Sequence, residues 1–295
     1  MLTSAALRPG DRIRIVAASG PVPEDRFNAG VQILRQRYEV VFDPAQVFAK
    51  QGYLAGDDAS RAAALNAAFM EPGTKAIWMA RGGYGLTRIL PALALTALQA
   101  HPKIIVGFSD VTALLAACAT AGLASVHGPV VTQLTQLCSE DLDHLWQLLE
   151  GEGPTLLSDL EAVTPGVATG RLLGGNLEVF SRLIGTPYVP DLHDAVLFFE
   201  DVGERPYRID RLLTHLQQAG VFSRARGLVL GEFFQCQDLA SNDSPEVQEV
   251  LRERLGGLSV PVAQGGLFGH GKRNRALPYG AQVVLDVGQG VLKIK

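Results

Sequence analysis

The chain has 295 residues, 47% of them hydrophobic and 19% charged, with a formal net charge of −4. This composition is typical of a globular protein with a sizeable core, and the length allows one large or two ordinary domains. No cluster of lysine and arginine is dense enough to follow a phosphate backbone, so we expect no nucleic-acid partner. No apolar stretch is long enough to cross a bilayer and no charged and apolar leader opens the chain, which predicts a cytoplasmic protein without membrane contact.

The cysteines and histidines predict neither a metal site nor a disulfide framework. Cys118, Cys138 and Cys236 lie far apart and form no CxxC pair, the spacing from which many structural zinc sites are built. No HExxH motif, EF-hand loop or cluster of histidine and aspartate at ligand spacing is present. We therefore expect no metal ion and no cofactor.

The first half of the chain alternates strands with helices. Near-continuous apolar runs predict strands at 13–18, 39–44, 75–80, 103–106 and 124–131. Amphipathic or alanine-rich segments predict helices between them, at 24–38, 57–70, 86–93 and 111–122. This alternation is typical of a parallel sheet with helices on both faces, so the fold class is predicted to be α/β with a Rossmann-like first domain.

Small or polar residues follow four of these strands. In a parallel sheet the carboxyl ends of the strands meet at one edge, where ligands bind. We therefore expect these four segments to converge on one crevice. They are ASGP at 18–21, ARGGYG at 80–85, GFSD at 107–110 and VHGP at 126–129.

The second half departs from this pattern after a segment rich in glycine, proline and acidic residues at 150–170. We predict a first domain over 1–145, a linker over 146–165 and a second domain over 166–295. Strand-like and helical segments mix in the second domain, which predicts a mixed, β-rich α+β architecture. The strand-like segments are 195–201, 226–233 and 281–287, and the helical segments are 209–220 and 244–257.

Ser109 is the candidate nucleophile. One interpretation of its position is an ordinary strand-to-helix turn in which Ser109 or Asp110 caps the helix. The other is a nucleophile on a strained elbow, although the G-x-S-x-G pattern is not met because Val111 replaces the last glycine. The convergence of the strand ends favours the second interpretation. A hydroxyl nucleophile also needs a base, and that base needs a group to orient it.

Two of the histidines are candidates for the base. His144 and His215 lie within amphipathic helices, and His101 and His193 lie in turns before strands. His127 in VHGPVV and His270 in GGLFGHGKRN remain, and His270 is favoured because nearby glycines let its loop approach a ligand closely. These glycines are Gly265, Gly266, Gly269 and Gly271.

The orienting carboxylate is expected at the end of the apolar strand 195–199, which is followed by Glu200 and Asp201. Strand alternation favours Glu200, because Asp201 shares the face of Phe199. The alternative interpretation is an acidic cluster at the start of a helix. Gly82 and Gly83 match neither a Walker A nor a dinucleotide motif, and their backbone N–H groups are candidates to bind an oxyanion.

A set of longer motifs resembles one known family. The motifs are RPGDRIRIVAASGPV, ARGGYGLTRIL, GFSDVTALL, HGP, LLGGNLEVFSRLIGTPY, LFFEDVGERPYRIDRLLTHL and the GHG loop. In this order and over essentially the whole length, the chain resembles the LD-carboxypeptidases, serine peptidases that include murein tetrapeptide carboxypeptidase and microcin C self-immunity proteins. The resemblance implies a Rossmann-like N-terminal domain similar to class I glutamine amidotransferases, a β-rich C-terminal domain and a homodimer.

The resemblance also implies a catalytic triad of Ser109, Glu200 and His270. The backbone N–H groups of Gly83 and Asp110 are then expected to form the oxyanion hole. Asn176, which follows a Gly-Gly turn, is expected either to cap a helix or to bind substrate. His127 is a second candidate for substrate binding.

The function expected from this resemblance is that of a serine carboxypeptidase. It would cleave an L,D-amide bond and release C-terminal D-alanine from a murein tetrapeptide during peptidoglycan recycling. Two alternatives remain at this point. One is an immunity-type hydrolase of peptidyl or aminoacyl nucleotide antibiotics, and the other is a non-catalytic module that binds a small ligand.

Overall fold

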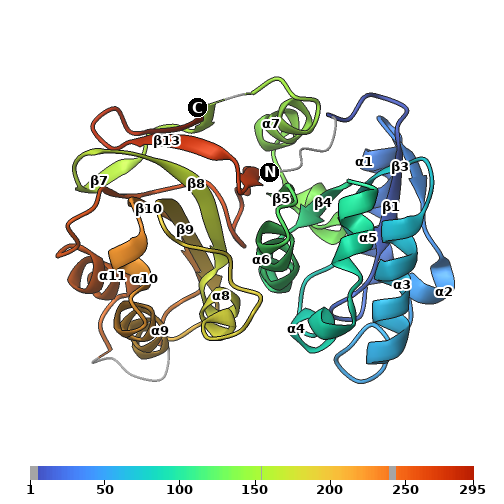
Figure 1. The fold of residues 1–295 in the computed structure, drawn as a ribbon, viewed down its shortest axis with the longest axis horizontal. Helices are drawn as coiled ribbons and strands as arrows, with labels where there is room; N and C mark the ends of the chain where they lie inside the picture. Colours follow the sequence, from blue (N-terminus) through green and yellow to red (C-terminus); the bar gives the residue numbers. More distant parts are fainter. Residues whose placement is uncertain (1–5, 154, 239–243) are drawn as a thin grey trace. The chain divides into compact units, whose positions relative to one another are not determined.

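The chain forms two compact units, shown in Figure 1. The computed structural model describes residues 6–153, 155–238 and 244–295. Unit 1 comprises Met1–Gly153 and Ala276–Gly280, and unit 2 comprises Pro154–Arg275 and Ala281–Lys295. The chain therefore returns to unit 1 once, late in the sequence, before it ends in unit 2.

The sheet of unit 1 has six strands in the order β12-β5-β4-β3-β1-β2. These are β1 (Arg12–Val16), β2 (Glu39–Val41), β3 (Thr74–Met79), β4 (Ile104–Gly107), β5 (Ser125–His127) and β12 (Leu277–Tyr279). Neighbouring strands from β2 to β5 are parallel, and β12 pairs antiparallel with β5. The order 2-1-3-4-5 is that of a doubly wound sheet, whose switch point lies between β1 and β3.

Helices complete unit 1. They are α1 (Glu24–Arg35), α2 (Pro44–Val47), α3 (Asp58–Met70), α4 (Leu86–Ile89), α5 (Leu95–Ala100), α6 (Thr112–Thr120) and α7 (Ser139–Leu149), with 3₁₀ turns η1 (Leu90–Ala92), η2 (Ser109–Val111) and η3 (Val131–Gln136). Alternate strand residues such as Ile13, Ile15 and Trp78 form one core with apolar residues of α1, η3 and α7. Helix α3 packs on β1 and β3, and α6 packs on β5.

The sheet of unit 2 has eight strands in the order β6-β14-β13-β8-β9-β10-β11-β7. These are β6 (Thr155–Leu157), β7 (Glu161–Thr164), β8 (Val167–Asn176), β9 (Ala195–Val202), β10 (Gly227–Phe234), β11 (Val262–Gln264), β13 (Gln282–Asp286) and β14 (Val291–Ile294). The four strands β8 to β11 are parallel, and antiparallel strands flank them on both sides. The predicted fold class is confirmed: a parallel-rich first sheet and a mixed second sheet.

The helices of unit 2 gather around α9, along one side of the sheet (Figure 1). They are α8 (Leu177–Leu183), α9 (Pro206–Gln218), α10 (Val221–Arg224) and α11 (Val247–Leu255). The range 146–165, expected as a linker, instead holds the end of α7 and the two short strands β6 and β7. Both strands are short and are flanked by turn residues, so their sequences show no strand periodicity.

None of the helices in the described ranges has the length and apolar character needed to cross a bilayer. The longest of them are α3, a capped helix of unit 1, and α9, an amphipathic helix of unit 2. Each is 13 residues long.

Gly30 is predicted to be required where α1 meets η3. A Cβ atom at Gly30 would lie 2.1 Å from the carbonyl oxygen of Val131, which is backbone and cannot rotate away. We expect Gly30→Ala to lower the free energy of unfolding by about 1–3 kcal/mol, although alanine ordinarily stabilises a helix relative to glycine by about 1 kcal/mol. Urea unfolding followed by circular dichroism measures this change.

Gly257→Ala is the matched control, because no atom lies within 4 Å of a Cβ at that position. We expect it to change the free energy of unfolding by no more than about 0.5 kcal/mol. Equal stability of the two variants would contradict the close approach of α1 and η3.

Candidate active site

Ser109 occupies a sharp turn between β4 and α6. Strand β4 ends at Gly107, and Ser109 opens the 3₁₀ turn η2 with a φ of 64°. Residues other than glycine are uncommon in this left-handed region, and such strain is concentrated at functional sites. Neither Ser109 nor Asp110 is the N-cap of α6, because that position is Val111, which makes no side-chain cap hydrogen bond. The turn therefore has the geometry of an elbow and not of a side-chain helix cap.

Glycines from two other strand ends surround Ser109. A Cβ atom at Gly82 would lie 2.9 Å from the Cβ of Ser109 and 3.0 Å from its Oγ. The N–H of Gly20 donates to the carbonyl oxygen of Gly82 over 3.0 Å, and a Cβ at Gly83 would lie 3.1 Å from the Cα of Gly20. The turns after β1, β3 and β4 thus meet at Ser109 as expected, and the absence of side chains on Gly82 and Gly83 allows this close approach.

His127, expected as a substrate-binding residue, is part of the interior of unit 1. Its side chain has no exposed surface, and its ring meets that of Phe108 edge to face, with centroids 5.9 Å apart. The residue lies on β5 opposite Gly107 of β4 and Leu277 of β12. With strands on both sides, His127 is enclosed in the interior of unit 1, and its expected role in substrate binding stays a prediction.

Unit 2 brings Glu200 and His270 together. Nδ1 of His270 lies 2.7 Å from Oε2 of Glu200. The Glu200 side chain is fully buried, and among the described residues its other oxygen, Oε1, has no hydrogen-bond partner. A carboxylate oxygen only accepts, so this contact places a proton on Nδ1 and the lone pair of the neutral ring on Nε2. That is the tautomer a general base needs.

The protonation of His270 is set by the carboxylates around it. Burial lowers the pKa of His270, but the charge of Glu200 and its hydrogen bond, with the charges of Asp201 and Glu232, raise it by more. The pKa therefore lies above the ordinary value of 6.5. Because each cause is a negative charge beside the ring, these carboxylates stabilise the imidazolium form.

Asp201 makes a different set of contacts from its neighbour Glu200. It accepts hydrogen bonds from the side chain of Asn176 over 3.1 Å and from the N–H groups of Glu178 and Val202 over 3.0 and 2.8 Å. Burial first, and then the charge of Glu200, raise the pKa of Asp201 to about 7. Only Glu200 of the two carboxylates contacts His270, as strand alternation predicts.

Asn176 is the N-cap of α8. Its Oδ1 accepts from the N–H of Val179 over 3.1 Å, and its amide nitrogen donates to Asp201. Of the two roles expected for Asn176, the structure contains the helix cap, made by Oδ1, while the amide nitrogen binds Asp201; the role in substrate binding stays a prediction. Asn176 therefore orders the end of β8 beside Glu200, with which it is paired in register.

The sequence reasoning did not identify Glu232, which lies near the end of β10. A Cβ atom at Gly271 would lie only 1.7 Å from Oε2 of Glu232, so this carboxylate lies directly against the loop of His270. Burial and the charge of Glu200 raise the pKa of Glu232. One feature of the sequence could have identified it: Glu232 lies near the end of the next strand-like segment in the chain after the one that carries Glu200.

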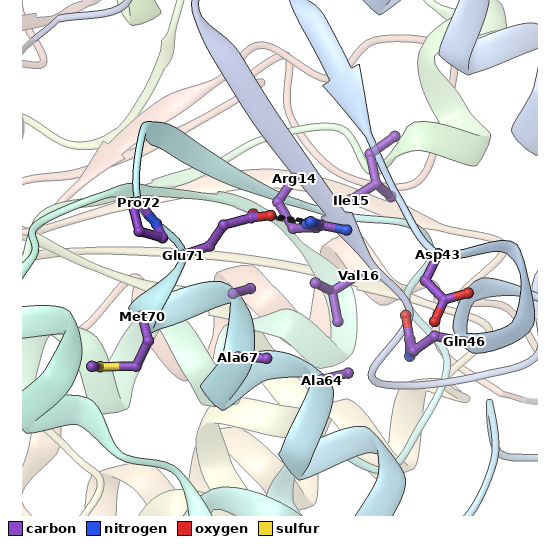
Figure 2. Close-up of a pocket in the computed structure, with 11 residues that line it drawn as sticks. Arg14, Ile15, Val16, Asp43, Gln46, Ala64, Ala67, Met70, Glu71 and Pro72 are labelled. Carbon is purple, nitrogen blue, oxygen red and sulfur yellow. Dashed lines mark hydrogen bonds and ion pairs between the residues drawn. The ribbon is translucent and has the colours of Figure 1, made fainter.

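Two cavities, one in each unit, are candidates for further parts of the site. One, of about 670 Å³ in unit 2, is lined by the end of β10 and by the loop before His270, and it includes Glu232 and Lys272. The other, of about 450 Å³ in unit 1, lies between β1 and α3 and does not include Ser109 (Figure 2). In the second cavity Arg14 and Glu71 form an ion pair, and the side chain of Gln46 binds the backbone of Ala17 just after β1. These polar groups therefore have hydrogen-bond partners within unit 1.

Within the described part of the chain, no cluster of three or more histidine, cysteine, aspartate or glutamate side chains could hold a metal ion.

Comparisons with known proteins identify the family. Models of the N-terminal and C-terminal domains of LD-carboxypeptidases match residues 13–128 and 169–285. A putative carboxypeptidase of Synechocystis sp. is 40% identical over 97% of this chain and 95% of its own length. Murein tetrapeptide carboxypeptidase of Pseudomonas aeruginosa is 31% identical, covering 93% of each chain.

Solved structures agree with these matches. The muramoyltetrapeptide carboxypeptidase from Oxalobacter formigenes superposes with a TM-score of 0.84 at 30% identity, over 96% of this chain and 97% of its own. Microcin C7 self-immunity protein in its wild-type apo state superposes with a TM-score of 0.88 at 26% identity, over 100% and 98%. With both family models matched in order, this chain belongs to the LD-carboxypeptidase family of hydrolases.

Proposed function

We propose that this protein is a serine carboxypeptidase that hydrolyses an L,D-amide bond and releases D-alanine from the end of a murein tetrapeptide. The observation that carries the proposal is the 2.7 Å contact between His270 and the fully buried Glu200, which orients a general base. The left-handed turn at Ser109, lined by glycines, supports Ser109 as the nucleophile. The names of the Pseudomonas and Oxalobacter relatives support the substrate class.

In the proposed reaction, Oγ of Ser109 attacks the carbonyl carbon of the scissile amide and its proton passes to Nε2 of His270. Glu200 stabilises the imidazolium that forms. The N–H groups of Gly83 and Asp110 bind the oxyanion of the tetrahedral intermediate. The C–N bond then breaks, His270 gives its proton to the leaving amine, and an acyl ester remains on Ser109. Water, deprotonated by His270, hydrolyses this ester and restores the serine.

A panel of peptides tests the substrate. We expect a murein tetrapeptide to lose its terminal D-alanine, detected by mass spectrometry, and a matched peptide that ends in L-alanine to stay intact. Efficient release of L-alanine would refute the proposed stereochemistry. The same peptide with an amidated end tests whether the free carboxylate is needed, and amidation should abolish cleavage.

The microcin C7 self-immunity protein, 27% identical to this chain over 324 residues, is the reason for including a second substrate class in the panel. Cleavage of an aminoacyl nucleotide conjugate but not of the tetrapeptide would favour an immunity-type hydrolase. Binding of a panel member without any product would favour a non-catalytic module. D-alanine release separates the proposed function from both alternatives.

Variants of the proposed triad should lose activity as a unit. We expect Ser109→Ala to lower turnover by about 10⁴-fold or more, His270→Ala by nearly as much, and the double variant hardly further, because the groups act in one step. Glu200→Gln should cost less, since the imidazole remains. Asp201→Asn and His127→Ala are the controls and should keep much more activity. Loss of turnover in His127→Ala with an active His270→Ala would show that the triad is assigned wrongly.

The pH dependence of kcat/KM should reflect the raised pKa of His270. The base acts only when neutral, and a raised pKa means that its proton is lost at higher pH, so the acidic limb should have a midpoint above 6.5. Glu232→Gln removes one of the charges that raise this pKa and should move the midpoint down. Glu161→Gln, on an exposed side chain bonded to Gln264, is the control and should leave it in place. A wild-type midpoint below 6.5, or one that Glu232→Gln does not move, would contradict this account.

Several features expected from the sequence stay predictions. They are the homodimer, the cytoplasmic location, the independence from metal and cofactor, and the absence of nucleic-acid and membrane partners. Sedimentation of the purified protein addresses the first of these.

A further inference from the structure

Asp110, the residue after the proposed nucleophile, directs its side chain into the interior of unit 1. The residue is only 2% exposed. Its Oδ2 accepts hydrogen bonds from Oγ of Ser19 over 2.6 Å and from the N–H of Leu86 over 3.0 Å. One buried carboxylate oxygen therefore accepts from two donors, neither of which is near Asp110 in the sequence.

These donors come from the two turns that meet at Ser109. Ser19 follows β1 and precedes Gly20, while Leu86 follows β3 and starts α4. One carboxylate thus ties the turn after β4 to the turns after β1 and β3. Those are also the turns whose glycines make room for the Ser109 side chain.

Arg61 of α3 contacts the same two turns. Its side chain is fully buried, and its guanidinium donates to the carbonyl oxygen of Ala18 and to the carboxylate of Asp58. A Cβ atom at Gly85 would lie 2.6 Å from its Nη1, so the cation also lies against the turn that donates to Asp110. Burial raises the pKa of Asp110, whereas its hydrogen bonds and the charge of Arg61 oppose that rise.

The conformation of Ser109 needs such support. A residue other than glycine in the left-handed region costs about 1–3 kcal/mol, and persists where the surrounding structure holds it. The residue directly after Ser109 is fixed by a carboxylate that reaches both neighbouring turns. The remaining freedom of the Ser109 turn is therefore small while those bonds are intact.

We propose that Asp110 is a positioning residue for the nucleophile: by binding Ser19 and Leu86 it holds Ser109 in its left-handed conformation beside Gly82. This proposal rests on the proposed function, in which Ser109 attacks the substrate. Asp110 acts through Ser109, and its side chain does not touch the substrate. Its role is thus distinct from that of its own backbone N–H in the oxyanion hole.

Two donors converge on Oδ2, so this atom must be an acceptor. An asparagine has one accepting atom and one NH₂ group, and an NH₂ group in the place of Oδ2 would face the N–H of Leu86. In the other orientation the buried NH₂ group needs an acceptor of its own, so Asp110→Asn disturbs the contact between the turns. A displacement of about 1 Å at a nucleophile lowers its rate by about 10²-fold.

The test measures the reactivity of Ser109 directly. A fluorophosphonate probe labels an activated serine without requiring the peptide substrate, so the labelling rate is recorded for the wild type, Asp110→Asn and Ser19→Ala. We expect labelling and kcat to fall by about 10²-fold in Asp110→Asn, with KM for the tetrapeptide changed by no more than about twofold. Ser19→Ala, which removes one donor and leaves the carboxylate, should fall by about tenfold.

Asp141→Asn is the matched control, because Asp141 is a fully buried aspartate of α7 in the same unit. It should leave the labelling rate unchanged even if the variant is less stable. The double variant Ser19→Ala/Asp110→Asn should label no more slowly than Asp110→Asn, because both changes break the same bond. Equal losses in Asp141→Asn and Asp110→Asn would overturn the proposal.

The outcomes separate this proposal from the proposed function. If the wild type is labelled at Ser109 and Asp110→Asn is labelled equally fast, positioning by Asp110 is refuted while the serine mechanism stands. If Ser109 of the wild type is not labelled, both are refuted. If Asp110→Asn does not fold, Ser19→Ala decides the question, and an unchanged labelling rate in that variant refutes the proposal.

Discussion

A parallel sheet brings the carboxyl ends of its strands to one edge, and both units of this protein place their chemistry there. In unit 1 the turns after β1, β3 and β4 meet at Ser109, and glycines keep side chains out of the space between them. In unit 2 the ends of β8, β9 and β10 carry Asn176, Glu200 and Glu232. The same constraint therefore supplies a nucleophile candidate from one sheet and a base with its orienting carboxylate from the other.

Local patterns were enough to predict the features that depend on neighbouring residues in the sequence. The apolar run 195–199 identified β9, and alternation along it distinguished Glu200 from Asp201, because a strand directs successive side chains to opposite faces. The turn at Ser109 was identifiable because the strand before it and the helix after it leave no linker. Its left-handed φ was not, since the sequence pattern is compatible with an ordinary turn as well.

Features that depend on distant strand pairing could not be predicted in the same way. The sequence places His127 at a strand end, but it does not show that β12 returns from residue 277 to pair with β5 and encloses this residue. Pro278 lies within β12, where an edge strand tolerates the missing N–H. The inward direction of Asp110 is of the same kind, because its partners follow β1 and β3. Such contacts are created by the sheet order, which alternation alone does not encode.

Two adjacent carboxylates in unit 2 differ in their chemistry because they have different partners. Glu200 faces the His270 ring and has one oxygen without a partner in the described structure, so the imidazole is its main counterpart. Asp201 faces backbone N–H groups and Asn176, and burial with the charge of Glu200 raises its pKa to about 7. The two neighbours therefore have separate contacts: Glu200 binds the histidine, and Asp201 binds Asn176 and the first turn of helix α8.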